Sequence, residues 1–374
     1  MQHFPLRLID LNYYYHGDII NPDAVLQIHA PSDAYASYMQ EKAHVNFVKH
    51  ANCETSITHN GTPFYFFRSR NRFWHIPFAT TAFVKKQLPG IVLVQGLVFP
   101  LQVIWLKWKL GKKVKIIAQH HGERPFSGLK GLFQRIADKS IAAYLFTSHG
   151  NAAEWIDKGV VKHKSKCHEI LEASVSFAPK NKTHCRQELG LNAATIFLWV
   201  GRLHPLKDPL TVLTAFEQFI ENNNGTALYM IYQTDELLPL IKAMLGKNRK
   251  LKNAVHLIGQ VPHNNLEYWY SAADFFVSGS HKEGSGYALL EAMACGCVPV
   301  VTKIPSFTKI TGNGAAGILF ETGNSQSLVD ALEHCMMMER EAFAKATRRH
   351  FESSLTSKKI ADDLLDLCYQ LIAK

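Results

Sequence analysis

Short apolar runs typical of buried strands alternate with helix-like segments along almost the whole chain. The clearest helix-like segments of the first half are residues 32–42 and 100–110. The expected strands of that half are residues 7–11, 45–48, 64–67, 91–94, 115–119 and 143–147. Strands and helices in regular succession predict parallel sheets that are covered by helices on both faces.

The pattern restarts after a polar, irregular stretch at residues 179–183, which we interpret as a linker. A chain of 374 residues is too long for one ordinary core, so we expect two doubly wound α/β domains, residues 1–178 and 179–356. Residues 357–374 carry apolar side chains at helical spacing, and we expect this helix to pack on the first domain. The expected strands of the second half are residues 196–200, 227–232, 255–258, 275–278, 298–301 and 317–320. Ligands of such folds bind at the carboxyl ends of the strands, which predicts a cleft between the two domains.

The longest uncharged stretch, residues 88–106, approaches the length of a membrane span. It is interrupted by Pro89, Gly90 and Pro100, so we interpret it as a strand, a turn and a helix of a soluble core. The first residues lack the apolar segment of a secretory signal. The seven cysteines are scattered and form no Cys-x-x-Cys pair, so neither a disulfide framework nor a zinc site is expected. These features favour a cytoplasmic location.

Basic residues are concentrated in the first half of the chain. The formal net charge is +10, and residues 68–135 hold 13 lysines and arginines against one acidic residue. Trp105 and Trp108 lie among the lysines of this segment. A basic segment with tryptophans can bind an anionic membrane surface or be a solvated face that keeps the protein in solution, and both interpretations stay open. No signature of a nucleic-acid-binding module is present, so nucleic acid is not an expected partner.

Two cations follow the expected strand at residues 196–200. Arg202 and Lys207 stand five residues apart in the loop that begins at Gly201. At the end of a parallel strand, two such side chains can neutralise a diphosphate. The alternative is a pair of solvated loop charges, and this segment alone does not decide between the two.

A second motif, residues 280–296, opens a helix after the expected strand at 275–278. Gly284 and Gly286 allow close approach of the backbone, and the free N–H groups at the start of the helix form an anion site. Glu283 and Glu291 bracket this site, and carboxylates accept hydrogen bonds from the vicinal hydroxyls of a sugar ring. The arrangement suits a ligand that contains a sugar, a diphosphate and a ribose in sequence.

This motif resembles the E-x7-E motif of the retaining glycosyltransferases of family 4, which have the GT-B fold. The Gly-Arg-Leu-x3-Lys-Asp run at residues 201–208 resembles the diphosphate-binding loop of that family. Residues 271–278 and 296–301 match the strands that flank the motif, and the likeness is continuous from about residue 196 to 334. The resemblance implies a GT-B fold of two Rossmann-like domains.

The resemblance also implies roles for individual residues. Glu283 would contact the donor sugar, Arg202 and Lys207 would hold the diphosphate as it leaves, and no metal or other cofactor would be needed. The implied donor-binding residues are the helix-start residues Ser285, Gly286 and Tyr287, then Glu291 for the ribose hydroxyls, and Gly259 and Gln260 for the base.

The first half resembles the family less. His121, in the run 119–124 after a strand, matches a strand-end histidine that would meet the donor sugar near the transferring carbon, whereas His120 alternates to the other side. The usual glycine-rich loop after the first strand is replaced by residues 11–17, which hold three tyrosines and one glycine. The usual Gly-x-Gly after the strand at 227–232 is also missing. We therefore expect an unusual acceptor pocket and changes in part of the nucleotide pocket.

The resulting hypothesis is a retaining transfer of a sugar from a nucleotide diphosphate sugar to a sugar or lipid-linked acceptor. The chain would act in cell-envelope polysaccharide or glycolipid synthesis, as a peripheral protein at the inner face of the membrane. The alternatives are a nucleotide-sugar epimerase or a phosphorylase on the same fold, or a non-catalytic module that binds anionic surfaces.

Overall fold

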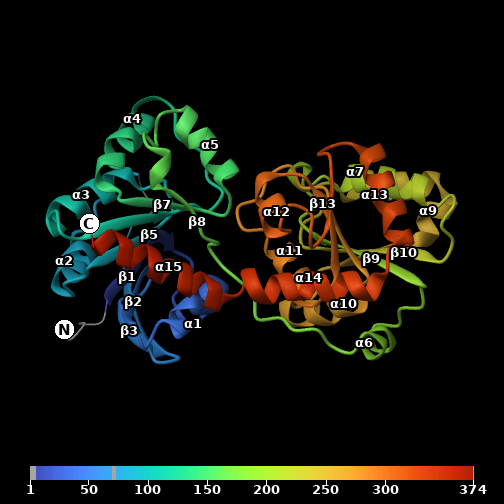
Figure 1. Ribbon diagram of the computed structural model, residues 1–374, viewed down its shortest axis with the longest axis horizontal. Coiled ribbons are helices and arrows are strands. Elements are labelled where there is room, and N and C mark those ends of the chain that lie inside the picture. The colour runs from blue at the N-terminus through green and yellow to red at the C-terminus, as the bar shows by residue number, and fades with distance from the viewer. Residues whose placement is uncertain (1–5, 70–72, 374) are drawn as a thin grey trace. The chain divides into compact units, whose positions relative to one another are not determined.

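The computed structural model describes residues 6–69 and 73–373. The chain forms two compact units (Figure 1). The first unit comprises the chain up to Ser174 together with the residues from Ser357 on, and the second comprises Val175–Thr356. Arg70 and Arg72, two cations of the basic segment, lie outside the described residues.

The first unit is built on an eight-stranded sheet with the order β3-β4-β2-β1-β5-β6-β7-β8. Its strands are β1 (Leu6–His16), β2 (Ala43–Ala51), β3 (Thr55–His59), β4 (Thr62–Phe67), β5 (Ile91–Gln95), β6 (Lys115–Gln119), β7 (Ala143–Phe146) and β8 (Cys167–Glu169). Neighbouring strands are parallel, apart from the antiparallel pair of β3 and β4. The chain winds outward from β1 to one side and then from β5 to the other, so the order of the sheet reverses between β1 and β5.

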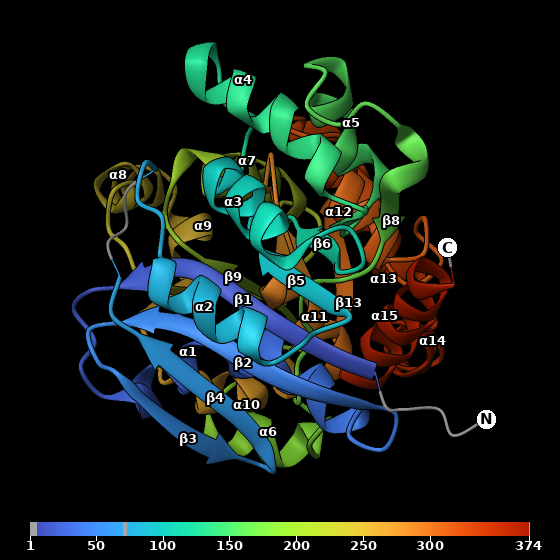
Figure 2. The ribbon, with the colours of Figure 1, turned by 90° about the vertical axis from the view of Figure 1, so that its left-hand side faces the viewer.

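Helices cover both faces of this sheet. They are α1 (Pro22–Asp33), η1 (Ala34–Tyr38), α2 (Phe78–Lys86), α3 (Pro100–Leu110), α4 (Gly128–Ala137), η2 (Asp138–Ser140), α5 (His149–Asp157), η3 (Lys164–Lys166) and α15 (Ser357–Ile372). Side chains of α2, α3 and α5 share one core with one face of the sheet, and those of α1, η1 and α15 share another core with the opposite face. Figure 2 looks onto the side that carries α2, α3 and α4. The expected C-terminal helix thus returns to the first unit.

Two local expectations for the first unit are wrong. The helix expected at residues 32–42 instead begins at Pro22, where the Asn21 side chain accepts a hydrogen bond from the Asp23 N–H, and it gives way to the 3-10 turn η1 after Asp33. The first strand does not end at residue 11. It continues to His16, because a shift in register after Asn12 allows residues 15 and 16 to go on pairing with β2.

The second unit contains a six-stranded parallel sheet with the order β11-β10-β9-β12-β13-β14. Its strands are β9 (Thr195–Gly201), β10 (Thr226–Tyr232), β11 (Val255–Gly259), β12 (Phe275–Ser278), β13 (Val298–Thr302) and β14 (Ile318–Phe320). All six expected strands of the second half are present, within a residue or so at each end. The order reverses between β9 and β12, and in such a sheet this is where a ligand binds.

The helices of the second unit pack on both faces of its sheet. They are α6 (Lys182–Glu188), η4 (Pro205–Lys207), α7 (Pro209–Phe219), α8 (Leu238–Lys247), α9 (Arg249–Ala254), η5 (His263–Asn265), α10 (Leu266–Ala272), α11 (Tyr287–Ala294), α12 (Pro305–Ile310), α13 (Ser325–Met337) and α14 (Arg340–Ser354). The central strands are apolar at successive positions because both of their faces are buried.

Candidate active site

The loops that follow β9 and β12 are joined to each other at the carboxyl edge of the second sheet. The His281 N–H donates to the Leu206 carbonyl at 2.9 Å, and His281 Nε2 lies 2.8 Å from Asp208 Oδ2. Asp208 has a left-handed backbone (φ 44°) and caps α7 by accepting a hydrogen bond from the Thr211 N–H at 3.1 Å. A Cβ atom added at Gly279 would lie 2.8 Å from the Asp208 carbonyl oxygen, so the close approach of the two loops requires glycine there. The two motifs predicted from the sequence, residues 201–208 and 280–296, therefore contact each other directly.

Lys207 and Glu283, predicted for different parts of the donor, contact each other. Their side chains form an ion pair in which Glu283 also accepts a hydrogen bond from Ser280 Oγ at 2.7 Å. The pair is largely enclosed, with side-chain exposures of 24% for Lys207 and 14% for Glu283. The backbone carbonyl of Ser280 is itself held by Thr302 Oγ1 at 2.6 Å. Each member of the pair thus fixes the position of the other.

Arg202 differs from Lys207 in its surroundings. Its side chain is exposed, and within the described part of the chain no hydrogen bond or ion pair engages its guanidinium group. The backbone carbonyl of Arg202 accepts a hydrogen bond from the His204 N–H at 2.8 Å, which tightens the loop. The loop therefore carries one exposed planar cation, Arg202, and one paired ammonium group, Lys207.

Helix α11 begins where the loop after β12 ends. Gly286 caps it with a left-handed backbone (φ 64°), and a Cβ atom at this position would lie 3.0 Å from the Phe307 ring. Ser285 is buried, whereas Tyr287, the first helical residue, is 39% exposed. The first turn of a helix carries N–H groups that have no intrahelical partner, and these favour an anion. The sequence-predicted Ser285, Gly286 and Tyr287 therefore lie at the start of α11, where such N–H groups are found.

Glu291 is buried on α11 and has two partners. Its Oε1 lies 2.6 Å from His263 Nε2, and its Oε2 accepts a hydrogen bond from the Tyr270 hydroxyl at 3.0 Å. The hydrogen bond and the charge of Glu291 raise the pKa of His263 despite its partial burial. The Phe177 ring lies against the His263 ring at 5.1 Å between centroids. His263 was not predicted as a site residue, because only the fold brings it beside a glutamate 28 residues away.

Gly259 is the last residue of the edge strand β11 of the second sheet, and Gln260 follows it. Gly259 has a left-handed backbone (φ 80°) and open space where a side chain would begin, and Gln260 is exposed. The short turn η5, which carries His263, comes next along the chain. Gly259 and Gln260 thus lie shortly before His263, which contacts Glu291. Among the described residues, neither takes part in the contacts of Lys207 and Glu283.

In the first unit, Glu123 connects the carboxyl ends of three strands. Its Oε1 accepts hydrogen bonds from the Tyr14 hydroxyl at 2.8 Å and the Leu97 N–H at 3.1 Å, and its Oε2 accepts one from the His121 N–H at 2.6 Å. Tyr14 lies near the end of β1, Leu97 follows β5 and His121 follows β6. One carboxylate therefore joins the carboxyl ends of β1, β5 and β6, next to the place where the strand order of this sheet reverses.

His121 is placed by two further side chains. Its Nε2 lies 2.7 Å from Gln95 Oε1, and its Nδ1 lies 3.1 Å from Glu172 Oε2. Burial alone would lower the pKa of His121, but the hydrogen bond and charge of Glu172, with the charges of Glu123 and Asp10, raise it. His120, by contrast, is fully buried and packs against the rings of Phe146 and Trp155.

Asp10 is a buried carboxylate at the centre of this cluster. Its Oδ2 accepts hydrogen bonds from the Tyr35 hydroxyl at 2.8 Å and Gln95 Nε2 at 2.7 Å, while its Oδ1 has no hydrogen-bond partner among the described residues. Burial raises the pKa of Asp10, although the charge of Lys49 acts in the opposite direction. Asp10, Gln95 and Glu172 were not predicted from the sequence, since each lies in or after a strand with no motif around it. Glu123 was not predicted either, although it lies in the run 119–124 that contains His121.

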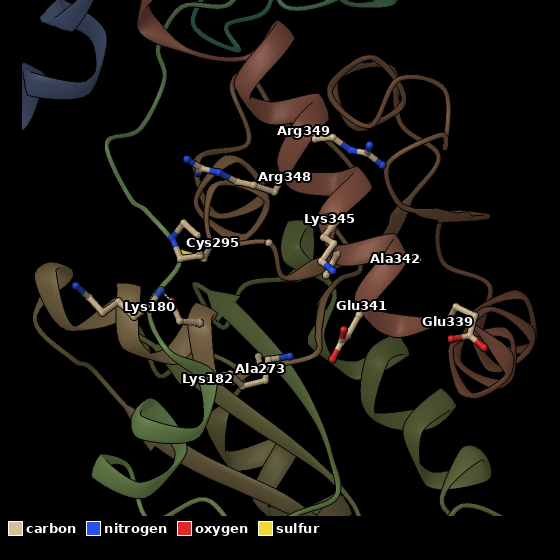
Figure 3. A pocket seen from close by; sticks show the side chains of 14 residues that line it. Lys180, Lys182, Ala273, Cys295, Glu339, Glu341, Ala342, Lys345, Arg348 and Arg349 are labelled. Atoms are coloured by element: carbon tan, nitrogen blue, oxygen red, sulfur yellow. Dashed lines mark hydrogen bonds between the residues drawn. The ribbon is translucent and has the colours of Figure 1, made fainter.

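A cavity of about 840 Å³ in the second unit lies away from these residues (Figure 3). Ala273, Cys295 and Gly296, which precede β12 and β13, line it together with Lys180 and residues of α14 such as Lys345. The amino ends of the strands form this edge of the sheet, whereas the predicted site is at the carboxyl edge. Burial raises the pKa of the Cys295 thiol to about 12, so this sulfur is not a reactive thiolate.

Among residues 6–69 and 73–373, no cluster of three or more histidine, cysteine, aspartate or glutamate side chains is arranged to hold a metal ion. Within the same residues, no helix has the length and apolar character needed to cross a bilayer.

The second unit is similar to a known family. Residues 181–350 match the model of the family Glycosyl transferases group 1, and this span contains all the predicted donor-site residues of the second unit. The D-inositol 3-phosphate glycosyltransferase of Streptosporangium roseum is 28% identical over 209 residues, which cover 50% of this chain and 46% of that protein. The UDP-Gal:alpha-D-GlcNAc-diphosphoundecaprenol alpha-1,3-galactosyltransferase of Escherichia coli is 32% identical over 160 residues, which cover 42% and 41%. The chain thus spans less than half the length of these curated relatives.

Solved structures resemble the whole chain. Sucrose-phosphate synthase from Thermosynechococcus elongatus matches with a TM-score of 0.71 at 18% identity, covering 98% of this chain and 99% of that one. Anabaena Alr3699/HepE in complex with UDP and glucose matches with a TM-score of 0.68 at 14% identity, covering 98% and 100%. The fold is therefore the two-domain α/β fold of the GT-B glycosyltransferases, as the sequence predicted.

Proposed function

We propose that this chain is a retaining glycosyltransferase of family 4, which moves a sugar from a nucleotide diphosphate sugar to a hydroxyl group of an acceptor. The observation that carries the proposal is the Lys207–Glu283 pair, which joins the loops after β9 and β12, with the exposed Arg202 in the first of these loops. The match of residues 181–350 to a glycosyltransferase family supports it. So do the structural relatives whose names include bound UDP or UDP-glucose.

The diphosphate would bind to Arg202, Lys207 and the first turn of α11. As the bond between the anomeric carbon and the phosphate oxygen breaks, negative charge grows on the leaving diphosphate. Cations and N–H groups that are already in position stabilise this charge more in the transition state than in the ground state. We therefore propose that no metal ion takes part.

Retention of the anomeric configuration follows in this proposal from reaction on one face of the sugar. The acceptor oxygen forms the new bond to the anomeric carbon on the side from which the phosphate leaves. The proton of the acceptor hydroxyl passes to the departing phosphate oxygen. Glu283 would hold the hydroxyls of the donor sugar, with its orientation set by Lys207 and Ser280.

Glu291 would bind the ribose hydroxyls while it keeps its present partners. Each carboxylate oxygen can accept more than one hydrogen bond, so the contacts with His263 and Tyr270 leave acceptor capacity for a ligand. Those two contacts fix the direction in which the carboxylate points. The base would lie against the backbone of Gly259 and Gln260, where the open space beside Gly259 admits a planar ring.

We assign the acceptor side to the first unit. His121 would approach the donor sugar near the transferring carbon, held in place by Gln95 and Glu172. The acceptor would be a sugar or a lipid-linked sugar, as in cell-envelope polysaccharide or glycolipid synthesis. The name of the Escherichia coli relative, which includes a diphosphoundecaprenol acceptor, supports a lipid-linked one. A chain with this role would work in the cytoplasm, at the anionic inner surface of the membrane.

The alternatives receive less support. An epimerase or a phosphorylase on the same fold would share the donor site, but the names of the relatives quoted above are those of transferases and synthases. A non-catalytic binding module would have no need for an ordered arrangement of Arg202, Lys207, Glu283 and Glu291.

Calorimetric titration with UDP, GDP and ADP in the absence of metal tests the donor site. We expect micromolar binding of one nucleotide, and we expect it to be lost in the Arg202→Ala variant. Transfer from the matching nucleotide sugar is then assayed, and NMR of the product reports its anomeric configuration. An inverted product would refute the retaining mechanism, and failure of all three nucleotides to bind would refute the donor site.

A further inference from the structure

Helix α4 is oriented with its apolar side toward solvent. The residues that it buries are Gly131, Gln134 and Ala137, which are small or polar. The side chains that it exposes include Leu129 at 59%, Leu132 at 47% and Ile136 at 43%. These three positions are separated by three and four residues, so they form one stripe along the helix. A surface helix of a globular protein ordinarily has the opposite arrangement.

Specific contacts hold α4 in this orientation. Gln134 Oε1 accepts a hydrogen bond from the Phe126 N–H at 2.7 Å, and Gln134 Nε2 donates one to the Leu97 carbonyl at 3.0 Å. A Cβ atom at Gly131 would lie 2.4 Å from the Phe126 carbonyl oxygen, so the helix approaches the chain too closely there for any side chain. Rotating the apolar stripe inward would break these contacts. These contacts therefore fix the orientation of α4, with its apolar stripe facing solvent.

Aromatic side chains extend the apolar stripe. Trp74 is 56% exposed, and its ring lies 5.7 Å from that of Phe133 on α4. On the neighbouring helices α2 and α3, Phe78 and Trp108 are also exposed, and both rings contact Trp105. Figure 2 shows α4, α3 and α2 on one side of the first unit. We call Leu129, Leu132, Ile136 and Trp74 the α4 apolar face.

The surroundings of the α4 apolar face are cationic. Residues 73–139 contain eleven lysines and arginines and two acidic residues, Glu123 and Asp138. Both carboxylates are enclosed, with exposures of 12% and 3%, and Asp138 is paired with Lys166. Lys130 and Arg135 on α4 are exposed. An exposed apolar stripe edged by tryptophan and cations suits the interface of an anionic bilayer, where apolar side chains enter the acyl boundary and cations meet lipid phosphates.

We propose that α4 lies in the interface of an anionic membrane, with Leu129, Leu132 and Ile136 inserted and Lys130 and Arg135 at the level of the headgroups. The proposal deepens the membrane part of the function proposed above and rests on it. It differs from the sequence-based interpretation, which centred on Trp105 and Trp108, by making α4 the inserted element. A second copy of the chain is a poorer occupant, because a symmetric contact would bring the same cations together.

Vesicle flotation tests this proposal without any need for turnover. Vesicles of phosphatidylcholine alone are compared with vesicles in which part of it is replaced by phosphatidylglycerol. The Leu132→Ser/Ile136→Ser variant removes two inserted side chains and keeps every charge. Leu240→Ser is the matched control, because Leu240 is 54% exposed on α8 of the second unit. We expect the wild type and the control to float with anionic vesicles, and the double variant to lose roughly tenfold in partitioning for each residue changed.

A second variant separates charge from insertion. Lys130→Glu/Arg135→Glu keeps the stripe and reverses two charges, so its binding is expected to fall and to depend less on salt than that of the wild type. Circular dichroism and nucleotide titration confirm that each variant is folded, since α4 lies outside the donor-site residues. Binding of Leu132→Ser/Ile136→Ser equal to that of the wild type would overturn the proposal. Failure of the wild type to float would also overturn it, as would a dimer in sedimentation that the double variant abolishes.

The two proposals fail in different ways. If the wild type floats with anionic vesicles but binds no nucleotide, the donor site is refuted and the role of α4 stands. If it binds a nucleotide but ignores vesicles, the role of α4 is refuted and the donor site stands.

Discussion

Lys207 and Glu283, 76 residues apart in the chain, form an ion pair between the loops that follow β9 and β12. These strands are neighbours at the place where the order of the second sheet reverses. The pair gives the proposed diphosphate site and the proposed sugar site a common side-chain contact. Each of the two side chains therefore restrains the orientation of the other.

Replacing Lys207 by alanine is expected to lower kcat/KM for transfer by about 100-fold or more, because one preorganised donor to the leaving group is lost. Steady-state kinetics with the matching nucleotide sugar measure this effect. Lys242→Ala, on the exposed side of α8 in the same unit, is the matched control and should leave the rate unchanged. A Lys207→Ala variant within threefold of the wild type would contradict the site assignment.

Replacing Glu291 by glutamine is expected to lower the pKa of His263 toward its ordinary value of 6.5, because the hydrogen bond to Glu291 and the charge of Glu291 are what raise it. In the wild type, the stability contributed by this pair is complete below that value and is lost as the pH rises through the raised pKa. NMR titration of the His263 ring and denaturation at several pH values check both statements. An unshifted His263 in the variant would show that Glu291 is not its main partner in solution.

Replacing Glu172 by glutamine is expected to lower the pKa of His121, since Glu172 supplies the largest contribution that opposes the effect of burial. The sign is the same as for His263: protonated His121 stabilises the wild type below pH 6.5, and this stability disappears as the pH passes the raised pKa. NMR titration and the pH profile of kcat/KM report the shift. Glu154→Gln on α5 removes a carboxylate of the same unit that is paired with Lys158 at the surface, and it should move neither measurement.

Replacing Gly279 by alanine is expected to destabilise the second unit by about 1–3 kcal/mol, because the new Cβ would force the two joined loops apart. Nucleotide binding should weaken in parallel, since Arg202 and Lys207 lie on the displaced loop. Thermal denaturation and calorimetry measure the two effects. Gly246→Ala is the matched control: a Cβ at this position in α8 meets nothing within 4 Å and should stabilise the protein by roughly 0.5–1 kcal/mol. Equal stability of the two variants would mean that the loops are not tightly joined.

The predictions of helices and strands were correct where the residues of a segment indicate its structure without reference to distant residues. The helix expected at residues 100–110 is α3 (Pro100–Leu110), and the strand expected at 275–278 is β12, because uniform apolar runs and helix-start prolines do not depend on distant residues. Strand β3 was missed because it is polar and exposed. The Asn60-Gly61 turn after it, with positive φ at both residues, is a hairpin signal that could have identified it.

The candidate site was only partly within reach of sequence reasoning. The residues that follow β9 and β12 could be singled out, because loops after parallel strands meet at one edge of the sheet. The ion pair of Lys207 and Glu283 could not be predicted, because it depends on how the two loops are joined at His281 and Gly279. His263, one of the two partners of Glu291, lies on a turn after the edge strand, and no spacing in the chain indicates their contact.

The sequence by itself determined the alternation of strands and helices, the division into two doubly wound sheets and the segments that end at the carboxyl edges. These features follow from hydrophobic periodicity and from local backbone preferences, both of which act within a few residues. The tertiary structure alone decided which side chains meet. Glu123 joins three strand ends, Lys207 meets Glu283, and Gln134 turns the apolar side of α4 outward. Such contacts arise between residues far apart in the chain, where burial and hydrogen-bond geometry select a partner that no local pattern specifies.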